Sequence, residues 1–200
     1  MYVPREFAET RVEVLREFVG AHPLGLLVRG DLEATHVPML LQGKFLRFHV
    51  ARANPVWHGI EGAGVLAVFS GPNHYVSPSW YPSKAEHGRV VPTWNYTAVY
   101  VRGTASLFEG TDELVSHLVE MVDAQEARFA APWRVSDAPA EYVAGLTRGV
   151  VGVSVRVEAM VGKFKLSQNR SAADRAGVVA GLLALGDRAA DEVAGVMRVG

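Results

Sequence analysis

The sequence predicts a mainly β chain with peripheral helices, arranged as a closed or split β-barrel. Three observations support this fold class. Short apolar runs separated by turn residues follow one another between residues 24 and 108, a pattern typical of a β-rich region. Helical patterns occupy both ends of the chain. A further helical stretch interrupts the strands between about residues 111 and 147.

The helices are predicted from apolar residues at helical spacing. They are expected over residues 10–20, 111–130 and 140–146, and from residue 174 onward. Gly20 and Pro23 end the first helix, and Gly186 breaks the alanine-rich tail.

The strands are predicted from compact or alternating apolar runs. They are expected over residues 24–28, 35–41, 44–50, 65–69, 93–108 and 150–157, with 160–166 extending the last. Asn54 followed by Pro55 predicts an N-capped helical turn within residues 53–60. The proline-rich stretch 71–92 is predicted to be a long loop, which in a compact domain is usually functional or mobile.

The length of 200 residues suits one domain, or one domain with a helical appendage. We expect the split barrel to span residues 1–170, including the helical insertion at about 111–147. Residues 171–200 are expected to form a helical tail of the same domain.

Charge and composition exclude several classes of function. The 20 basic and 21 acidic side chains nearly cancel, which argues against nucleic acid or an anionic membrane as a dominant partner. With no cysteine, disulfides, thiolate metal sites and a cysteine nucleophile are excluded. Neither a signal peptide nor an apolar run long enough to span a membrane is present, so a cytoplasmic location is expected.

The segment 49–55 is the first candidate binding segment. A strand is expected to end here and run into a helical turn, and free backbone N–H groups at such a junction favour an anion. Arg52 can add a bidentate phosphate contact, and His49 and Asn54 offer further donors. The alternative is that Asn54 only caps the turn and that Arg52 is solvated.

The segment 74–82 is the second candidate binding segment. It brings aromatic and hydroxyl side chains together between prolines, a combination that suits a planar polar ligand. The alternative is a proline-braced loop that covers the end of the barrel.

The segment 91–96 is the third. In a strand, Trp94 and Tyr96 lie on one face and Thr93 and Asn95 on the other. Thr93 and Asn95 can then bond the edge of a ligand. The alternative is an ordinary strand with an aromatic core face.

The segment 163–170 is the fourth. Lys163, Lys165 and Ser167 alternate with Phe164 and Leu166, so one side of a strand is basic and polar. Such a strand can bind phosphate, or it can be an exposed edge protected by its lysines.

Other motifs that carry chemistry are missing from the sequence. It contains no GxGxxG, no P-loop, no HExxH and no GxSxG. His36, His49 and His74 could converge, but a lone histidine on a strand is more often a structural donor, so no metal site is predicted. No catalytic residue is predicted either.

Taken together, the segments resemble the PaiB-like family of FMN-binding negative transcriptional regulators. The resemblance spans nearly the whole chain, although residues 110–150 and the tail after 175 match in helical character rather than in motif. The matching motifs are Met1-Tyr2-Val3-Pro4, His22-Pro23-Leu24-Gly25, Thr35-His36-Val37-Pro38, His49-Val50-Ala51-Arg52-Ala53-Asn54-Pro55, Gly71-Pro72, Tyr75-Val76-Ser77-Pro78-Ser79-Trp80-Tyr81, Pro92-Thr93-Trp94-Asn95-Tyr96 and Lys163-Phe164-Lys165-Leu166-Ser167-Gln168-Asn169-Arg170.

The resemblance implies a split β-barrel of the pyridoxamine-phosphate oxidase-like flavoprotein kind. Such barrels usually form homodimers with two flavin sites along the interface. FMN is the implied cofactor, with Arg52 and Asn54 at its phosphate end. The implied contacts to its ring or ribityl chain are Ser77, Trp80, Thr93 and Asn95, and Lys163, Lys165 and Gln168 come from the same or the opposite subunit. The whole predicted FMN site is His49, Ala51, Arg52, Asn54, Ser77, Trp80, Tyr81, Thr93, Trp94, Asn95, Lys163, Lys165 and Gln168.

The resemblance favours a flavin-dependent regulator or sensor. The alternative is a flavin-dependent oxidoreductase, such as an NAD(P)H:flavin reductase or a pyridoxamine-phosphate oxidase-like enzyme. Because the flavin performs the redox chemistry, a missing catalytic motif counts little against it. A repressor that contacts DNA directly is the second alternative, but the sequence has neither a helix-turn-helix nor a basic arm. Some barrels of this type bind haem or deazaflavin in place of FMN.

Overall fold

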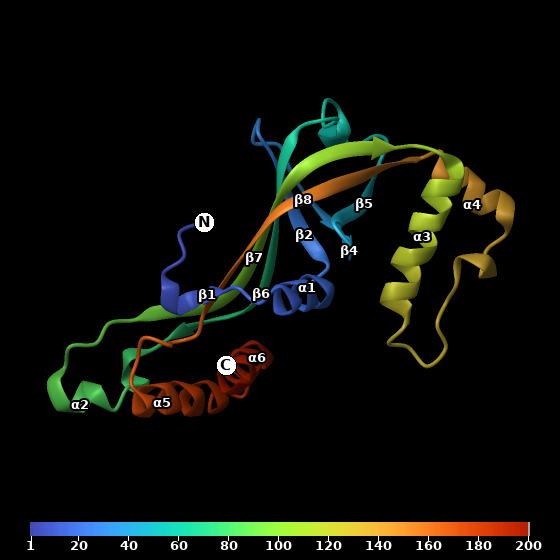
Figure 1. Ribbon diagram of the computed structural model, residues 1–200. Coiled ribbons are helices and arrows are strands. Elements are labelled where there is room, and N and C mark those ends of the chain that lie inside the picture. Colours follow the sequence, from blue (N-terminus) through green and yellow to red (C-terminus); the bar gives the residue numbers. More distant parts are fainter. Residues whose placement is uncertain (200) are drawn as a thin grey trace. The chain divides into compact units, whose positions relative to one another are not determined.

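The computed structural model describes residues 1–199 of the chain. Its strands form a mainly antiparallel sheet in the order β3-β2-β6-β7-β8-β5-β4, and β1 pairs with β8 (Figure 1). The strands are β1 (Ala8–Glu9), β2 (Leu24–Arg29), β3 (Ala34–Pro38), β4 (Leu40–Gln42), β5 (Phe45–Ala51), β6 (Gly64–Val76), β7 (Thr93–Phe108) and β8 (Val150–Lys165).

The helices lie at the two ends of the chain and in two connections. They are α1 (Val12–Ala21), α2 (Ser83–His87), α3 (Thr111–Glu126), α4 (Ala140–Thr147), α5 (Ala172–Leu183) and α6 (Arg188–Val199). Short 3-10 turns are η1 (Arg5–Phe7), η2 (Pro55–Trp57), η3 (Pro78–Trp80) and η4 (Val135–Asp137).

The chain divides into two compact units. The first unit consists of Met1–Phe18, Ser70–Val99 and Val161–Gly200, and the second unit of Val19–Phe69 and Tyr100–Met160. The long strands β6, β7 and β8 each contribute residues to both units.

The second unit is built around antiparallel ladders. Strand β5 pairs with β8 from Phe45 opposite Arg156 to Ala51 opposite Val150. Helix α3 contributes Leu114, His117 and Met121 to the buried residues, at helical spacing. Helices α3 and α4 contact each other and, with the segment between them, form the predicted insertion (Figure 1).

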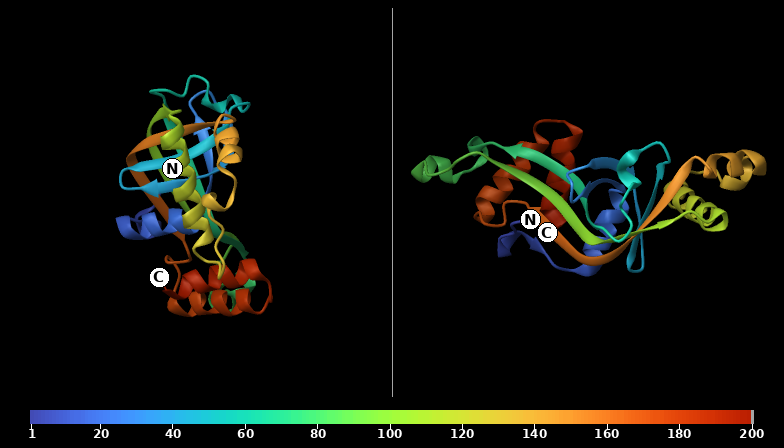
Figure 2. Two further views of the ribbon diagram at one scale, coloured as in Figure 1. Left: turned by 90° about the vertical axis from the view of Figure 1, so that its right-hand side faces the viewer. Right: turned by 90° about the horizontal axis from the view of Figure 1, so that it is seen from above.

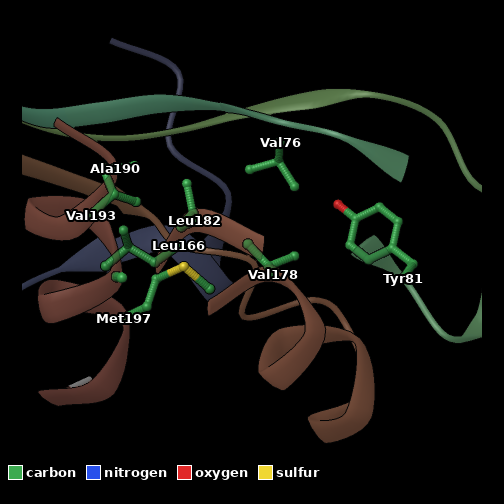
Figure 3. Packing of buried hydrophobic residues seen from close by; sticks show 9 residues of the cluster. Val76, Tyr81, Leu166, Val178, Leu182, Ala190, Val193 and Met197 are labelled. Atoms are coloured by element: carbon green, nitrogen blue, oxygen red, sulfur yellow. The ribbon is translucent and has the colours of Figure 1, made fainter. Parts of the chain in front are cut away.

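The first unit has a core of its own at the C-terminal helices. Helices α5 and α6 lie side by side (Figure 2), joined through Gly186 at a positive φ of 68°. Their apolar side chains pack with residues of β6, η3 and the end of β8 (Figure 3). This buried cluster is Val76, Tyr81, Leu166, Val178, Leu182, Ala190, Val193, Ala194 and Met197.

Most predicted elements are confirmed. Strand β7 has the predicted bounds, the first helix and both insertion helices are present, and the tail is helical on both sides of Gly186. The predicted long loop over 71–92 is wrong in part, because β6 continues to Val76 and η3 and α2 follow. On the β2 side of β6, Pro72 lies beyond the ladder, which ends at Val68, so no N–H donor is needed there.

Candidate functional site

The predicted site residues fall into the two units. The second unit holds His49, Ala51, Arg52 and Asn54. The first unit holds Ser77, Trp80, Tyr81, Thr93, Trp94, Asn95, Lys163, Lys165 and Gln168.

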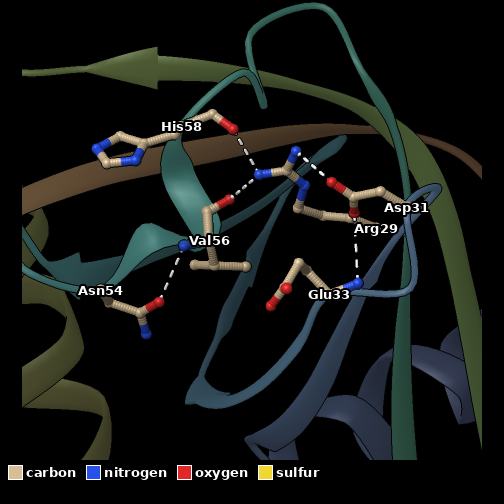
Figure 4. Close-up of polar contacts among 6 residues, drawn as sticks. All are labelled: Arg29, Asp31, Glu33, Asn54, Val56 and His58. Carbon is tan, nitrogen blue, oxygen red and sulfur yellow. Dashed lines mark hydrogen bonds and ion pairs between the residues drawn. The ribbon is translucent and has the colours of Figure 1, made fainter.

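In the second unit, Asn54 caps the turn η2, as predicted. Its side-chain oxygen accepts from the backbone N–H of Val56 at 3.0 Å (Figure 4). The guanidinium of Arg29 donates to the carbonyl oxygens of Val56, at 2.8 Å, and His58, and it pairs with Asp31 at 2.8 Å (Figure 4). Side chains therefore form hydrogen bonds with the backbone at both ends of this turn.

Arg52 is held by groups of the protein itself. It donates to the carbonyl oxygens of Arg148 at 3.2 Å and Val150 at 3.1 Å, and its Nη1 lies 2.8 Å from a carboxylate oxygen of Glu109. The backbone N–H of Arg52 donates to the Gly149 carbonyl at 2.8 Å. An anion at this strand end would therefore compete with Glu109 for the guanidinium.

The backbone N–H groups next to Arg52 also have hydrogen-bond partners within the protein. The N–H of Asn54 donates to the carbonyl oxygen of Ala51 at 2.8 Å, and that of His58 donates to Pro55 at 3.0 Å. Ala51 itself is exposed at the end of β5. The N–H groups of Asn54, Val56 and His58 are thus engaged within the turn.

His49 contacts α3. Its Nδ1 lies 3.3 Å from Nε2 of His117, and burial lowers the pKa of His49. This side chain packs the insertion onto strand β5.

In the first unit, one face of β6, β7 and β8 carries aromatic rings and ammonium groups. We call Tyr75, Trp94, Tyr96, Lys163 and Lys165 the aromatic–lysine face. The rings of Tyr75 and Trp94 meet edge to face at 6.2 Å and are 43% and 49% exposed. The ammonium of Lys163 lies 5.4 Å from the centroid of the Tyr96 ring.

The polar groups of this face are fixed by hydrogen bonds. The Lys165 ammonium donates to the Trp94 carbonyl oxygen at 3.0 Å and to the Thr93 hydroxyl. The indole N–H of Trp94 donates to Asn73 at 3.2 Å. Burial, followed by repulsion from Lys163 and Arg170, lowers the pKa of Lys165. A nearby anion would relieve this repulsion.

Two further predicted residues, Asn95 of β7 and Gln168 after β8, already have hydrogen-bond partners within the protein. Asn95 is fully buried and donates to the Ser167 hydroxyl at 3.0 Å and to the Met197 sulfur at 3.4 Å. Gln168 bonds back to its own strand end, accepting from Leu166 N–H at 2.7 Å and donating to the Phe164 carbonyl. Both polar side chains therefore have protein partners.

The turn η3, which contacts α5, contains or adjoins three of the predicted residues, Ser77, Trp80 and Tyr81. Ser77 caps η3 by accepting from the backbone N–H of Ser79. The Trp80 ring packs so closely on α5 that an added Cβ at Gly181 would lie 2.4 Å from it. Tyr81 is buried in the C-terminal cluster, and burial raises its pKa.

Tyr75 and Asn73 contact Trp94 but are not among the predicted site residues. Their strand is predicted to be a loop because Gly71 and Pro72 interrupt the pattern. Reading the alternation of β6 onward from Phe69 would have placed the two side chains on one strand face.

Neither a metal cluster nor a membrane-spanning helix is found among the described residues. Across residues 1–199, no three His, Cys, Asp or Glu side chains are placed to hold a metal ion. No described helix combines the length and the apolar character that crossing a membrane requires. The second unit has a cavity of about 500 Å³ in the insertion and one of about 350 Å³ beside Arg47, and the residues that line them are not among the predicted ones.

Comparison with protein families gives a match over most of the chain. The family described as "Putative FMN-binding domain" matches residues 1–159. The "Protease synthase and sporulation protein PAI 2" of Bacillus subtilis (strain 168) is 34% identical over 187 residues, covering 90% of this chain and 87% of that protein. An uncharacterized protein of Emericella nidulans, AN0679, is 29% identical, covering 99% of this chain and 96% of that protein.

Two solved flavoproteins share the fold. The flavocytochrome Anf3 from Azotobacter vinelandii superposes with a TM-score of 0.59 at 16% identity, over 82% of this chain and 72% of that chain. The FAD and heme binding protein from Mycobacterium smegmatis gives 0.59 at 14% identity, over 90% and 80%. These likenesses confirm the predicted fold class.

Proposed function

The chain belongs to the FMN-binding domain family, so FMN is its cofactor, and we propose that it acts as a flavin-dependent regulator or sensor. The Bacillus relative, whose name refers to protease synthesis and sporulation, supports the regulatory part of the proposal. The aromatic–lysine face supports the flavin site, because it combines exposed aromatic rings with ammonium groups, as a planar ligand with an anionic end requires.

The chemistry of this face fits FMN. The isoalloxazine ring is planar and can lie against Trp94 and Tyr75, and the phosphate is an anion that Lys163 or Lys165 can receive. When bound, FMN supplies the redox chemistry. The residues of the chain orient the ring and neutralise the phosphate.

The direct test is titration of the cofactor-stripped protein with FMN, followed by flavin fluorescence. We expect saturable binding at one site per chain, and weaker binding of riboflavin, which lacks the phosphate. No saturable binding at high protein concentration would contradict a flavin function.

Turnover distinguishes the two flavin functions. A regulator or sensor should reduce its flavin slowly with NAD(P)H and should not turn over, whereas an oxidoreductase should consume NAD(P)H continuously. Binding of promoter DNA that weakens steeply with salt would instead support direct DNA contact. The homodimer and the cytoplasmic location stay predictions, and sedimentation velocity measures the first.

Arg52, in the second unit, is the alternative phosphate contact to the lysines of the first unit, and it can be tested through its ion pair. Arg52→Ala should weaken FMN binding by on the order of 1.5–3 kcal/mol if the guanidinium meets the phosphate. Glu109→Gln should strengthen binding, because it removes the carboxylate that lies 2.8 Å from Arg52. Unchanged affinity in both variants would remove Arg52 from the site.

A further inference from the structure

Helix α3 is held to the sheet through a pair of histidines. His117 of α3 is 0% exposed, and its Nε2 lies 3.3 Å from Nδ1 of His49 on β5. The two rings meet edge to face at 5.4 Å, and the ring of Phe108 lies 5.4 Å from His117 on another side. The pair therefore sits inside the packing between helix and strand.

This contact depends on the number of protons that the pair carries. Two imidazole nitrogens form a hydrogen bond only when one holds a proton and the other a lone pair. Protons on both contacting nitrogens would place two N–H groups opposite each other. The Nδ1 of His117 is also buried and has no hydrogen-bond partner among residues 1–199, so a proton there would bring an unpaired charge.

Among the charged groups near the pair, Arg47 disfavours protonation of His117. Arg47, two residues before His49 on β5, pairs with Glu113 of α3 at 2.6 Å and lies over the Phe108 ring. Glu120 of α3 accepts from Gln42 of β4 at 2.9 Å. Burial, followed by repulsion from His49 and Arg47, lowers the pKa of His117 to about 4.

We propose that the His49–His117 contact is an acid-sensitive latch, which holds α3 against β5 at neutral pH and releases it on protonation. Release would free the helical insertion and uncover Phe108, Leu114 and Met121, which are buried when α3 is docked.

The direction follows from proton linkage. In the released state the pKa of His117 returns toward 6.5, above its value in the docked state, so protons favour release. Docking is fully stable above about pH 6.5 and weakens as the pH falls toward 4. By this linkage, the ratio of released to docked protein should rise roughly 50-fold between pH 7 and pH 4.5.

The methionine methyl groups provide the test. Met121 lies on α3, whereas Met39 and Met197 are buried elsewhere in the second and first units. In NMR spectra of methyl-labelled full-length protein, acidification should move the Met121 signal toward its exposed position first. The signals of Met39 and Met197 should stay in place over the same pH range.

Variants separate the latch from general acid unfolding. His117→Phe removes the titrating group and keeps a ring, so Met121 should stay docked at pH 4.5. His117→Leu also removes the titrating group and decides the question if the first variant does not fold. His36→Gln, at an exposed histidine of the same unit, should respond like the wild type.

Three results would overturn the latch. Met121 and Met39 could change together at one pH, which would be global unfolding. Met121 could fail to respond down to pH 4. The His117 variants could respond like the wild type, which would assign the acid response to Glu113 and Glu120 instead.

Discussion

Replacement of Gly177 by alanine should destabilise the protein by about 2 kcal/mol, although alanine is the better helix former. Gly177 lies in α5, and an added Cβ there would stand 2.1 Å from the carbonyl oxygen of Trp80. That oxygen belongs to the backbone of η3, so it cannot swing aside as a flexible side chain would. Helix and turn would have to separate, which would open the C-terminal cluster.

Gly195 in α6 is the matched control. It is exposed, and an added Cβ would meet no described atom within 4 Å outside its own helix. Gly195→Ala should therefore raise the free energy of unfolding by about 1 kcal/mol through helix propensity alone. Urea unfolding measures both variants, provided that the slope with denaturant is unchanged. Stabilisation by both alanines would contradict the close packing of α5 on Trp80.

Trp94→Ala should raise the dissociation constant of FMN by about 10- to 100-fold. The exposed indole is the largest ring of the aromatic–lysine face, and stacking of a planar base on an aromatic side chain contributes about 1–3 kcal/mol. Trp94→Phe should recover part of this loss, because it keeps a ring but loses the hydrogen bond to Asn73. Fluorescence titration of the flavin measures all three proteins.

Trp133→Ala provides the control for the loss of an indole. Trp133 is 46% exposed, similar to Trp94, but lies in the insertion of the second unit. It should leave FMN affinity unchanged. If wild type binds FMN and Trp94→Ala binds it equally well, the flavin lies elsewhere in the protein, and the remaining candidates are the residues around Arg52.

Local sequence patterns predicted the elements that short-range interactions determine. Strand β7 follows from alternation, the break between α5 and α6 from Gly186, and the cap of η2 from Asn54 before Pro55. Each depends on residues a few positions apart, so propensity and hydrogen bonding within one segment suffice. At Pro72, glycine and proline predicted a loop, although β6 continues through this position. The loop prediction was wrong there because the point where the pairing of β2 with β6 ends depends on residues far apart in the chain.

The tertiary structure alone decided which side chains meet. His49 and His117 are 68 residues apart, and Asn95 bonds Ser167 across 72. The pairing of β7 with β8 turned Asn95 toward the C-terminal helices and left Trp94 exposed beside Lys165. The residue patterns indicate a β-rich chain with helices at its ends and in one insertion, and the family resemblance adds the flavin. Strand order and register decide which polar groups find hydrogen-bond partners within the protein. The polar groups without such partners are the ones available to a ligand.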